Sequence, residues 1–187
     1  MRRSRLRFAA APLLVLLAGC QSGPDAPMQT VEHVDLPRFM GDWHVIANIP
    51  TWLERGAYDA VENYALADDG TIATTFTFRA GSFDGPLKTY RPRGFVLDRQ
   101  TNARWGMRFI WPVKADYRII HLDAAYAHTV IGRQKRDYVW IMARAPQIPE
   151  ADYQRLLQVV AGHGYDISKV RRVPQSPPGA RDATVTE

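Results

Sequence analysis

The chain has 187 residues, of which 46% are hydrophobic and 23% are charged, and these values are typical of one ordinary globular domain. Its formal net charge is +5, but four of its arginines lie within the first seven residues. Without those four, 20 of the 24 basic side chains remain against 19 acidic ones, and this near balance leaves no persistent basic face for nucleic acid.

The N-terminal segment has the parts of a secretory signal peptide. A basic start precedes an apolar run, Phe8–Ala18, that is too short to span a bilayer stably. Leu17-Ala18-Gly19-Cys20 then resembles the bacterial lipobox, in which cleavage before the cysteine leaves an acylated N-terminus. We therefore expect residues 1–19 to be removed and Cys20 to carry lipid. The alternatives are a plain secretory signal with an incidental cysteine, or an uncleaved anchor.

Cys20 is the only cysteine, which excludes a disulfide framework, a cysteine-rich metal site and a cysteine nucleophile in the folded part. Gln21 follows it where, by resemblance to bacterial lipoproteins, an Asp would indicate retention in the inner membrane. We therefore expect a lipid anchor in the outer membrane, facing the periplasm. Composition divides the rest into a flexible tether (20–30), one domain (31–173) and a disordered tail (174–187).

Short alternating runs separated by turn residues dominate the domain. Asp68-Asp69-Gly70, for example, is a hairpin signal between two of these runs. Their number and spacing predict a mainly β fold, either an up-and-down antiparallel barrel or a sandwich. The eight strand candidates are Trp43–Ile49, Ala60–Leu66, Thr71–Arg79, Lys88–Leu97, Arg104–Ile110, Tyr117–Asp123, Ala127–Gly132 and Tyr138–Arg144.

One helix is predicted after Pro149. Tyr153, Leu156, Leu157, Val160 and Ala161 form a single apolar stripe at helical spacing, and glycines end the pattern. A helix with one apolar stripe must pack on another surface, and we expect that surface to be the outside of the barrel. A short last strand, Val170–Val173, can follow it.

These elements are similar to those of the lipocalin family. Gly41-Asp42-Trp43 resembles the Gly-x-Trp signature of its first strand, and Arg144 stands where lipocalins place an Arg at the end of the eighth. Several further stretches, among them Leu53–Gly56, resemble the bacterial outer-membrane branch. The resemblance covers about residues 31–173 and implies an eight-stranded barrel with one C-terminal helix packed outside.

The resemblance also implies how one end of the barrel is closed. Trp43 and Arg144, with Gly41 beside them, would form a structural plug through a cation–π contact of roughly 0.5–2 kcal/mol. His44 and Asn48 depart from the usual motif, and we expect them to affect the rim or exterior. The family's middle motif is present only loosely, as Asp123 with Tyr126.

Alternation along each strand predicts which side chains face the interior, because an inward residue fixes the face of every second neighbour. Trp43 takes Val45 and Ala47 inward with it. The resemblance to bacterial lipocalins implies that Trp105, Met107, Phe109, Tyr117, Ile119 and His121 also face inward. Together with the alternation, this gives the predicted ligand-binding residues: Phe76, Phe78, Tyr90, Val96, Trp105, Met107, Phe109, Tyr117, Ile119, His121, Trp140 and Met142. A charged headgroup could meet Arg108, Lys114 or Arg118 near the open end.

The sequence therefore indicates a membrane-anchored protein that stores or transports a fatty acid, a lysophospholipid or a similar apolar ligand. We expect no cofactor, no metal and no catalytic residues, because the five histidines lack ligand spacing and no acid–base pair is evident. A monomer or weak homodimer is expected. An enzyme acting on a lipid or pigment, and a structural lipoprotein with a filled barrel, remain the alternatives.

Overall fold

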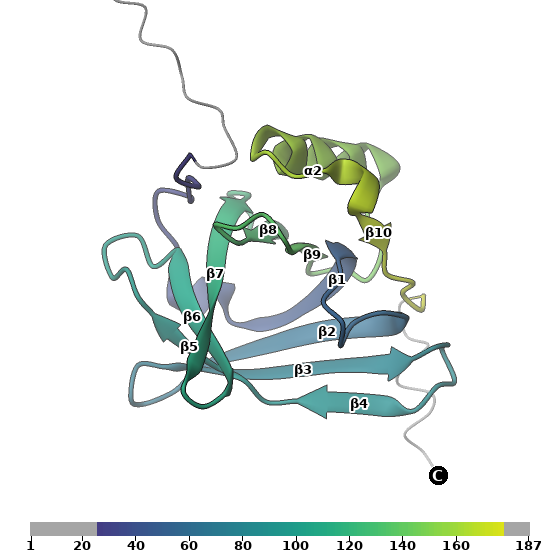
Figure 1. Cartoon of the computed structure of the whole chain (residues 1–187), viewed down its shortest axis with the longest axis horizontal. Helices are drawn as coiled ribbons and strands as arrows, with labels where there is room; N and C mark the ends of the chain where they lie inside the picture. The colour runs from purple at the N-terminus through teal and green to yellow at the C-terminus, as the bar shows by residue number, and fades with distance from the viewer. Residues whose placement is uncertain (1–25, 178–187) are drawn as a thin grey trace, which may run out of the picture.

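The structure is a closed antiparallel β-barrel, seen in a computed structural model that describes residues 26–177 (Figure 1). β1 pairs with both β2 and β9, so the sheet closes on itself. This confirms the predicted up-and-down barrel against the sandwich alternative. Its strands are β1 (Gly41–Ile49), β2 (Ala57–Leu66), β3 (Ile72–Ala80), β4 (Leu87–Tyr90), β5 (Arg93–Val96), β6 (Arg104–Ile110), β7 (Val113–Leu122), β8 (His128–Gly132) and β9 (Val139–Ala143).

Two short strands, β4 and β5, share the fourth position of the barrel. We predicted one continuous strand over Lys88–Leu97, but the chain breaks at Arg91-Pro92. Pro92 has no N–H to donate to a ladder, although its carbonyl accepts from the Thr74 N–H at 3.2 Å. Both strands pair with β3, one after the other, so together they supply the one position that an eight-stranded barrel requires.

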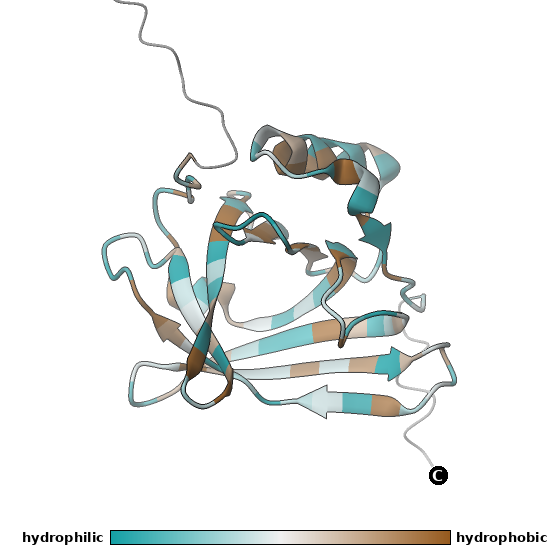
Figure 2. Ribbon diagram, in the orientation of Figure 1, coloured by the Kyte–Doolittle hydropathy of each residue, from teal (hydrophilic) through white to brown (hydrophobic). Residues whose placement is uncertain are grey.

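A single long helix, α2 (Glu150–Gly162), packs on the outside of the barrel, as predicted. Its buried face consists of Tyr153, Leu156 and Val160, which contact an outer cluster on β1, β8 and β9 (Figure 2). Glu150 and Asp152 in its first turn complement the positive end of the helix dipole. After a short 3₁₀ turn, η1 (Ile167–Lys169), the strand β10 (Arg171–Arg172) pairs with β1.

Two apolar clusters lie on opposite faces of the sheet, and a β-bulge decides the face of one predicted residue. The register of β1 against β9 shifts between Val45 and Ala47. Val45 belongs to the inner cluster, but Ala47 belongs to the outer cluster beneath α2. The inward prediction for Ala47 is therefore wrong. The next residue, Asn48, is buried directly opposite Trp140; it does not line the cavity and borders an outer pocket beside the β1–β2 loop.

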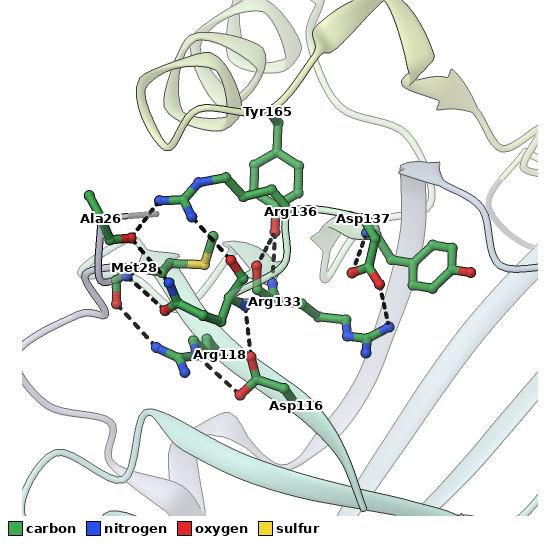
Figure 3. A network of polar contacts seen from close by, with 10 residues as sticks. Ala26, Met28, Asp116, Arg118, Arg133, Arg136, Asp137 and Tyr165 are labelled. Carbon is green, nitrogen blue, oxygen red and sulfur yellow. Dashed lines mark hydrogen bonds and ion pairs between the residues drawn. The ribbon is translucent and has the colours of Figure 1, made fainter. Parts of the chain in front are cut away.

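The first described residues lie along the barrel wall beside the β8–β9 turn (Figure 3). The Ala26 carbonyl accepts from Gln134 Nε2 at 3.1 Å and from Arg136 Nη2 at 3.0 Å, and the Met28 N–H donates to Gln134 Oε1 at 3.0 Å. Met28 is buried in the outer cluster. Residues 26–30, which we expected in a flexible tether, are thus part of the folded domain; Cys20 and residues 1–19 lie outside the described range.

The C-terminal segment is likewise fixed over its first residues. Gln175 Nε2 donates to the carbonyls of Val45 and Ala60, and the Ser176 hydroxyl donates to Asp59 at 2.7 Å. The predicted disorder is therefore wrong for residues 174–177, while 178–187 lie outside the described range. Across residues 26–177, no helix has the length and apolarity needed to cross a membrane.

Candidate ligand-binding cavity

Arg144 closes one end of the barrel against Trp43. The guanidinium carbon lies 3.9 Å from the centroid of the Trp43 ring, within the range of a cation–π contact. The same guanidinium donates hydrogen bonds to the carbonyls left free where the short helix α1 (Leu36–Phe39) ends and β1 begins. Its acceptors are the carbonyls of Arg38, Phe39, Met40, Asp42 and Tyr126.

Gly41 allows this close approach. Its φ of +94° is in the region that L side chains rarely adopt, and a Cβ there would lie 3.4 Å from Arg144 Nη1. Tyr126, from the loosely matched middle motif, also holds this end, because its hydroxyl accepts from the Asp35 N–H at 2.9 Å. The sealed end is thus built by contacts between segments that lie more than 80 residues apart in the chain.

An aromatic layer separates the sealed end from the cavity. The fully buried Phe39 ring lies 5.0 Å from Trp43 and 5.5 Å from Trp105, measured between ring centroids. Trp105 in turn stacks on Tyr117 at 5.1 Å with an interplanar angle of 8°. Large rings at this level fill the barrel, so open space begins only beyond Tyr117.

The cavity occupies the other half of the barrel and has a volume of about 300 Å³. It opens between the β1–β2 loop, the β6–β7 turn and the residues around the β8–β9 turn. Most of its walls are apolar, and its size is far above that of a site for a few waters. It is lined by Thr51, Trp52, Leu53, Glu54, Glu62, Phe76, Pro92, Met107, Phe109, Ile110, Ala115, Asp116, Tyr117, Arg133, Tyr138 and Trp140. The structure thus favours the hollow barrel over the filled-barrel alternative.

The predicted ligand-binding residues differ in whether they border the open cavity. Those that border the cavity are Phe76, Met107, Phe109, Tyr117 and Trp140, with Phe109 half-exposed at the mouth. Phe78, Trp105, Ile119 and Met142 are buried in the inner cluster without bordering the open space, and Tyr90 and Val96 pack against that cluster. The alternation therefore identified inner-face residues but did not tell which of them lie beside empty space.

His121 does not face the interior, and its predicted place in the lining is wrong. A register shift between Ile119 and His121 places His121 opposite Val130, a residue of the outer cluster. Residues directly opposite in a ladder share a face, so the imidazole lies on the outer side of the sheet. Partial burial lowers its pKa, and the nearby Asp123 opposes that change.

Glu54 supports the wall near the mouth. Its Oε1 accepts from Trp140 Nε1 at 2.6 Å, and its Oε2 accepts from the Thr51 N–H at 2.9 Å and the Thr51 hydroxyl at 2.7 Å. Both carboxylate oxygens are therefore occupied. Because Glu54 binds both Thr51 and Trp140, it holds the β1–β2 loop against β9 and fixes the Trp140 ring in the cavity wall.

Glu62 is a second carboxylate in the cavity, farther inside. It lies opposite Trp43 on β1 and opposite Phe76 on β3, both of which face inward. Glu62 accepts a short hydrogen bond from the Tyr64 hydroxyl, and the Tyr64 and Tyr117 hydroxyl oxygens are 2.8 Å apart. Burial raises the pKa of Glu62 from 4.5 to about 7, although the Tyr64 hydrogen bond opposes the shift.

Sequence reasoning missed both carboxylates, although a signal for Glu62 was present. Alternation along β2 places Ala60, Glu62 and Tyr64 on one face, and Ala60 and Tyr64 are almost fully buried. The sequence analysis predicted this strand but assigned no inward face to it. Glu54 lies in a loop, where periodicity gives no information about orientation.

The cations considered for a headgroup lie outside the cavity. Arg108 and Lys114 both lie over the ring of Phe95, and Arg118 pairs with Asp116. The cation in the lining is instead Arg133, at the end of β8, which pairs with Asp137 at 3.3 Å (Figure 3). Among residues 26–177 there is no group of three His, Cys, Asp or Glu side chains that could hold a metal ion.

A single-chain barrel with one sealed end, one mouth and an apolar interior defines a class of proteins that enclose small hydrophobic molecules. Comparison with known proteins agrees with this class. The sequence model of the lipocalin-like domain matches residues 34–175. Outer membrane lipoprotein Blc of Escherichia coli K12 is 30% identical over 168 residues, which cover 89% of this chain and 94% of the relative.

Two further relatives extend the comparison. Temperature-induced lipocalin-1 of Arabidopsis thaliana is 31% identical over 170 residues, covering 83% of this chain and 88% of the relative. The solved structure of insecticyanin from the tobacco hornworm Manduca sexta has a TM-score of 0.63 at 17% identity, covering 80% of this chain and 85% of that one, and it supports the fold alone.

The chain therefore belongs to the lipocalin family, and its Blc relatives place it in the bacterial branch. This confirms the resemblance found in the sequence. Membership assigns the chain to a family of binding proteins for lipids and other small hydrophobic ligands, not to a family of enzymes.

Proposed function

We propose that this protein stores or carries fatty acids, lysophospholipids or similar single-chain amphiphiles in the cell envelope. The observation that supports this most strongly is the apolar cavity of about 300 Å³, sealed at one end and open at the other. Burying about ten methylene groups at ~0.8 kcal/mol each contributes roughly 8 kcal/mol before the cost of association. Apolar burial is thus large enough to hold an alkyl chain without special chemistry.

The location we propose is the outer membrane, on its periplasmic face, through acylated Cys20. The lipobox-like Leu17–Cys20 supports an anchor, and the relatives named outer membrane lipoprotein Blc support that membrane. Two or more acyl chains are needed for stable anchoring, and a lipoprotein N-terminus of this type supplies them.

The short segment between Cys20 and Ala26 limits how the barrel can be oriented on the membrane. Ala26 is bound to the β8–β9 turn, in the half of the barrel that holds the cavity mouth. Six residues from Cys20 to Ala26 reach at most about 20 Å. An acylated Cys20 would therefore keep the mouth close to the bilayer surface, where amphiphiles are found.

The rim of the mouth is apolar in a way that suits this orientation. Trp52 is 75% exposed, and Ile110 and Trp111 at the β6–β7 turn are each 78% exposed. Exposed aromatic residues gathered around a binding site mark interaction surfaces, and Trp favours the membrane interface. A ligand leaving the bilayer would meet an apolar path into the cavity.

Native mass spectrometry of the mature chain, purified without detergent exchange as a Cys20→Ser variant, tests the binding function. We expect a co-purified single-chain lipid, and Trp140→Ala should reduce its retention because Trp140 forms part of the wall. The matched control is Leu66→Ala, an exposed apolar residue at the sealed end. An empty barrel that also fails to take up added palmitate or lysophosphatidylcholine would overturn the proposal.

A further inference from the structure

At the inner end of the cavity the lining presents the Glu62 carboxylate as an acceptor, and the hydroxyls of Tyr64 and Tyr117 beside it are already engaged. In the ionised form of Glu62, the Tyr64 hydroxyl donates to its carboxylate, so the proton between the two tyrosines comes from Tyr117. Both hydroxyl protons are thus directed along one chain toward Glu62. Nearer the mouth, the Trp140 N–H and the Thr51 hydroxyl are directed at Glu54 in the same way.

Glu62 differs from Glu54 because one of its carboxylate oxygens accepts no hydrogen bond from the described residues. In the described residues, Tyr64 supplies the one hydrogen bond to Glu62, at Oε2, and no protein donor reaches Oε1. Glu62 is only partly buried because it borders the open cavity. A carboxyl group in an apolar space with a free lone pair is costly unless a partner enters that space.

The charges that face the cavity define what this partner can be. Tyr64 on β2 binds Glu62 directly, and the other titratable side chains of the cavity lining are Glu54 in the β1–β2 loop, Asp116 and Tyr117 on β7, Arg133 after β8, and Tyr138. Arg133, the one cation in the lining, pairs through Nη1 with Asp137 near the mouth, and its buried Nε has no partner among the described residues. A ligand carboxylate that entered first would meet Glu62 without a compensating cation, and like charges at short range repel.

We propose that the cavity selects apolar ligands whose leading end carries a hydrogen-bond donor, a hydroxyl or an amine, and that Glu62 is the acceptor that selects them. This inference rests on the proposed function, because it assumes that the cavity holds an alkyl chain. It deepens that function by naming the polar group that the buried end prefers: a fatty acid or lysophospholipid enters with its alkyl end first and keeps its headgroup at the mouth, whereas an alcohol or amine can enter with its polar end first and bind more tightly. A ligand hydroxyl can donate to Glu62 whether Glu62 is ionised or protonated. A ligand ammonium forms an ion pair only when Glu62 is ionised.

The pKa of Glu62, raised by burial to about 7, makes the two donor classes distinguishable. Above that pH the carboxylate pairs with an ammonium, and below it the neutral acid does not. Amine affinity should therefore rise with pH through about 7, while alcohol affinity changes little. No such dependence would arise if Glu62 only supported the fold.

Isothermal titration of the mature chain with decan-1-ol, decylamine and decanoate tests the proposal. At about pH 8 we expect the alcohol and the amine to bind about tenfold or more tightly than decanoate, since a charge-assisted hydrogen bond is stronger than a neutral one. Glu62→Gln should remove the pH dependence of amine binding and weaken it about tenfold, while the alcohol, which the Gln carbonyl can still accept, changes less.

Asp68→Asn, an exposed carboxyl in the β2–β3 turn at the sealed end, is the matched control and should change none of these affinities. Glu62→Leu, which loses the acceptor altogether, should weaken both donor ligands but not decanoate. Equal affinities for the three ligands, unchanged in Glu62→Gln, would overturn this inference and leave the proposed function standing. Failure of every ligand to bind would overturn both.

Discussion

The guanidinium of Arg144 lies 3.9 Å from the Trp43 ring centroid and donates hydrogen bonds to carbonyls of the segment that leads into β1. The two residues lie 101 positions apart, near the start of β1 and just after β9. Because β1 and β9 are the pair whose ladder closes the barrel, this contact fastens the closure at its sealed end. The cavity depends on it, since a barrel open at both ends would be a channel.

Arg144→Lys should destabilise the fold although it keeps the charge. A lysine has no planar fork and cannot reach the same set of carbonyls, so several partly buried acceptors lose their donor. We expect a loss of about 2–4 kcal/mol in the free energy of unfolding, measured by urea titration. Arg155→Lys, in an exposed pair with Asp152 on α2, should cost well under about 1 kcal/mol. Equal effects of the two substitutions would contradict this account.

Comparing Gly41→Ala with Gly56→Ala separates the cost of backbone strain from the cost of displacing Arg144. Gly41 and Gly56 both have positive φ, at +94° and +74°, but a Cβ at Gly56 meets nothing within 4 Å. Each substitution should therefore cost about 1 kcal/mol or more in strain. Gly41→Ala should cost more than Gly56→Ala, because its Cβ also presses on Arg144 Nη1. Thermal unfolding of the two variants measures the difference, and a larger loss at Gly56 would be the contrary result.

Glu62 should make the protein less stable as the pH rises. The unfolded carboxyl releases its proton near 4.5 and the folded one near 7, so between these values the folded state binds more protons than the unfolded state. Stability is thus full below about 4.5 and falls through this window by up to ~3 kcal/mol. In Glu62→Gln this loss should be absent. Urea titrations at about pH 5 and about pH 8 compare the variants, and an identical pH dependence in both would contradict the buried-acid account.

The apolar rim should determine how strongly the mature chain binds to a bilayer. Trp111→Ala removes an exposed indole that does not line the cavity, so binding to vesicles of phosphatidylethanolamine and phosphatidylglycerol should weaken about tenfold. Leu66→Ala, at the sealed end, is the control and should have little effect. Co-sedimentation of the Cys20→Ser variant with vesicles makes the measurement. Equal losses in the two variants would argue against a membrane-facing mouth.

The sequence by itself determined the architecture. Period-two alternation, turn residues and one helical stripe are local properties, so they located the strands and α2 and limited the fold to a barrel or a sandwich without knowledge of any long-range contact. The family resemblance then favoured the barrel. The distant pair Trp43 and Arg144 became evident only through the family resemblance, because nothing local connects a Trp to an Arg 101 residues later. The inner face of β6 was also predicted, as Trp105 and Met107 show.

Only the tertiary structure decided what the interior presents to a ligand. Alternation fixes the face of a strand only as far as the next β-bulge, and the bulges at Ile46 and Ile120 depend on the register with neighbouring strands. For this reason Ala47 and His121 lie outside. The acceptor group of Glu62, Tyr64 and Tyr117 joins β2 to β7 across the barrel, and the burial that raises the Glu62 pKa exists only once the sheet has closed.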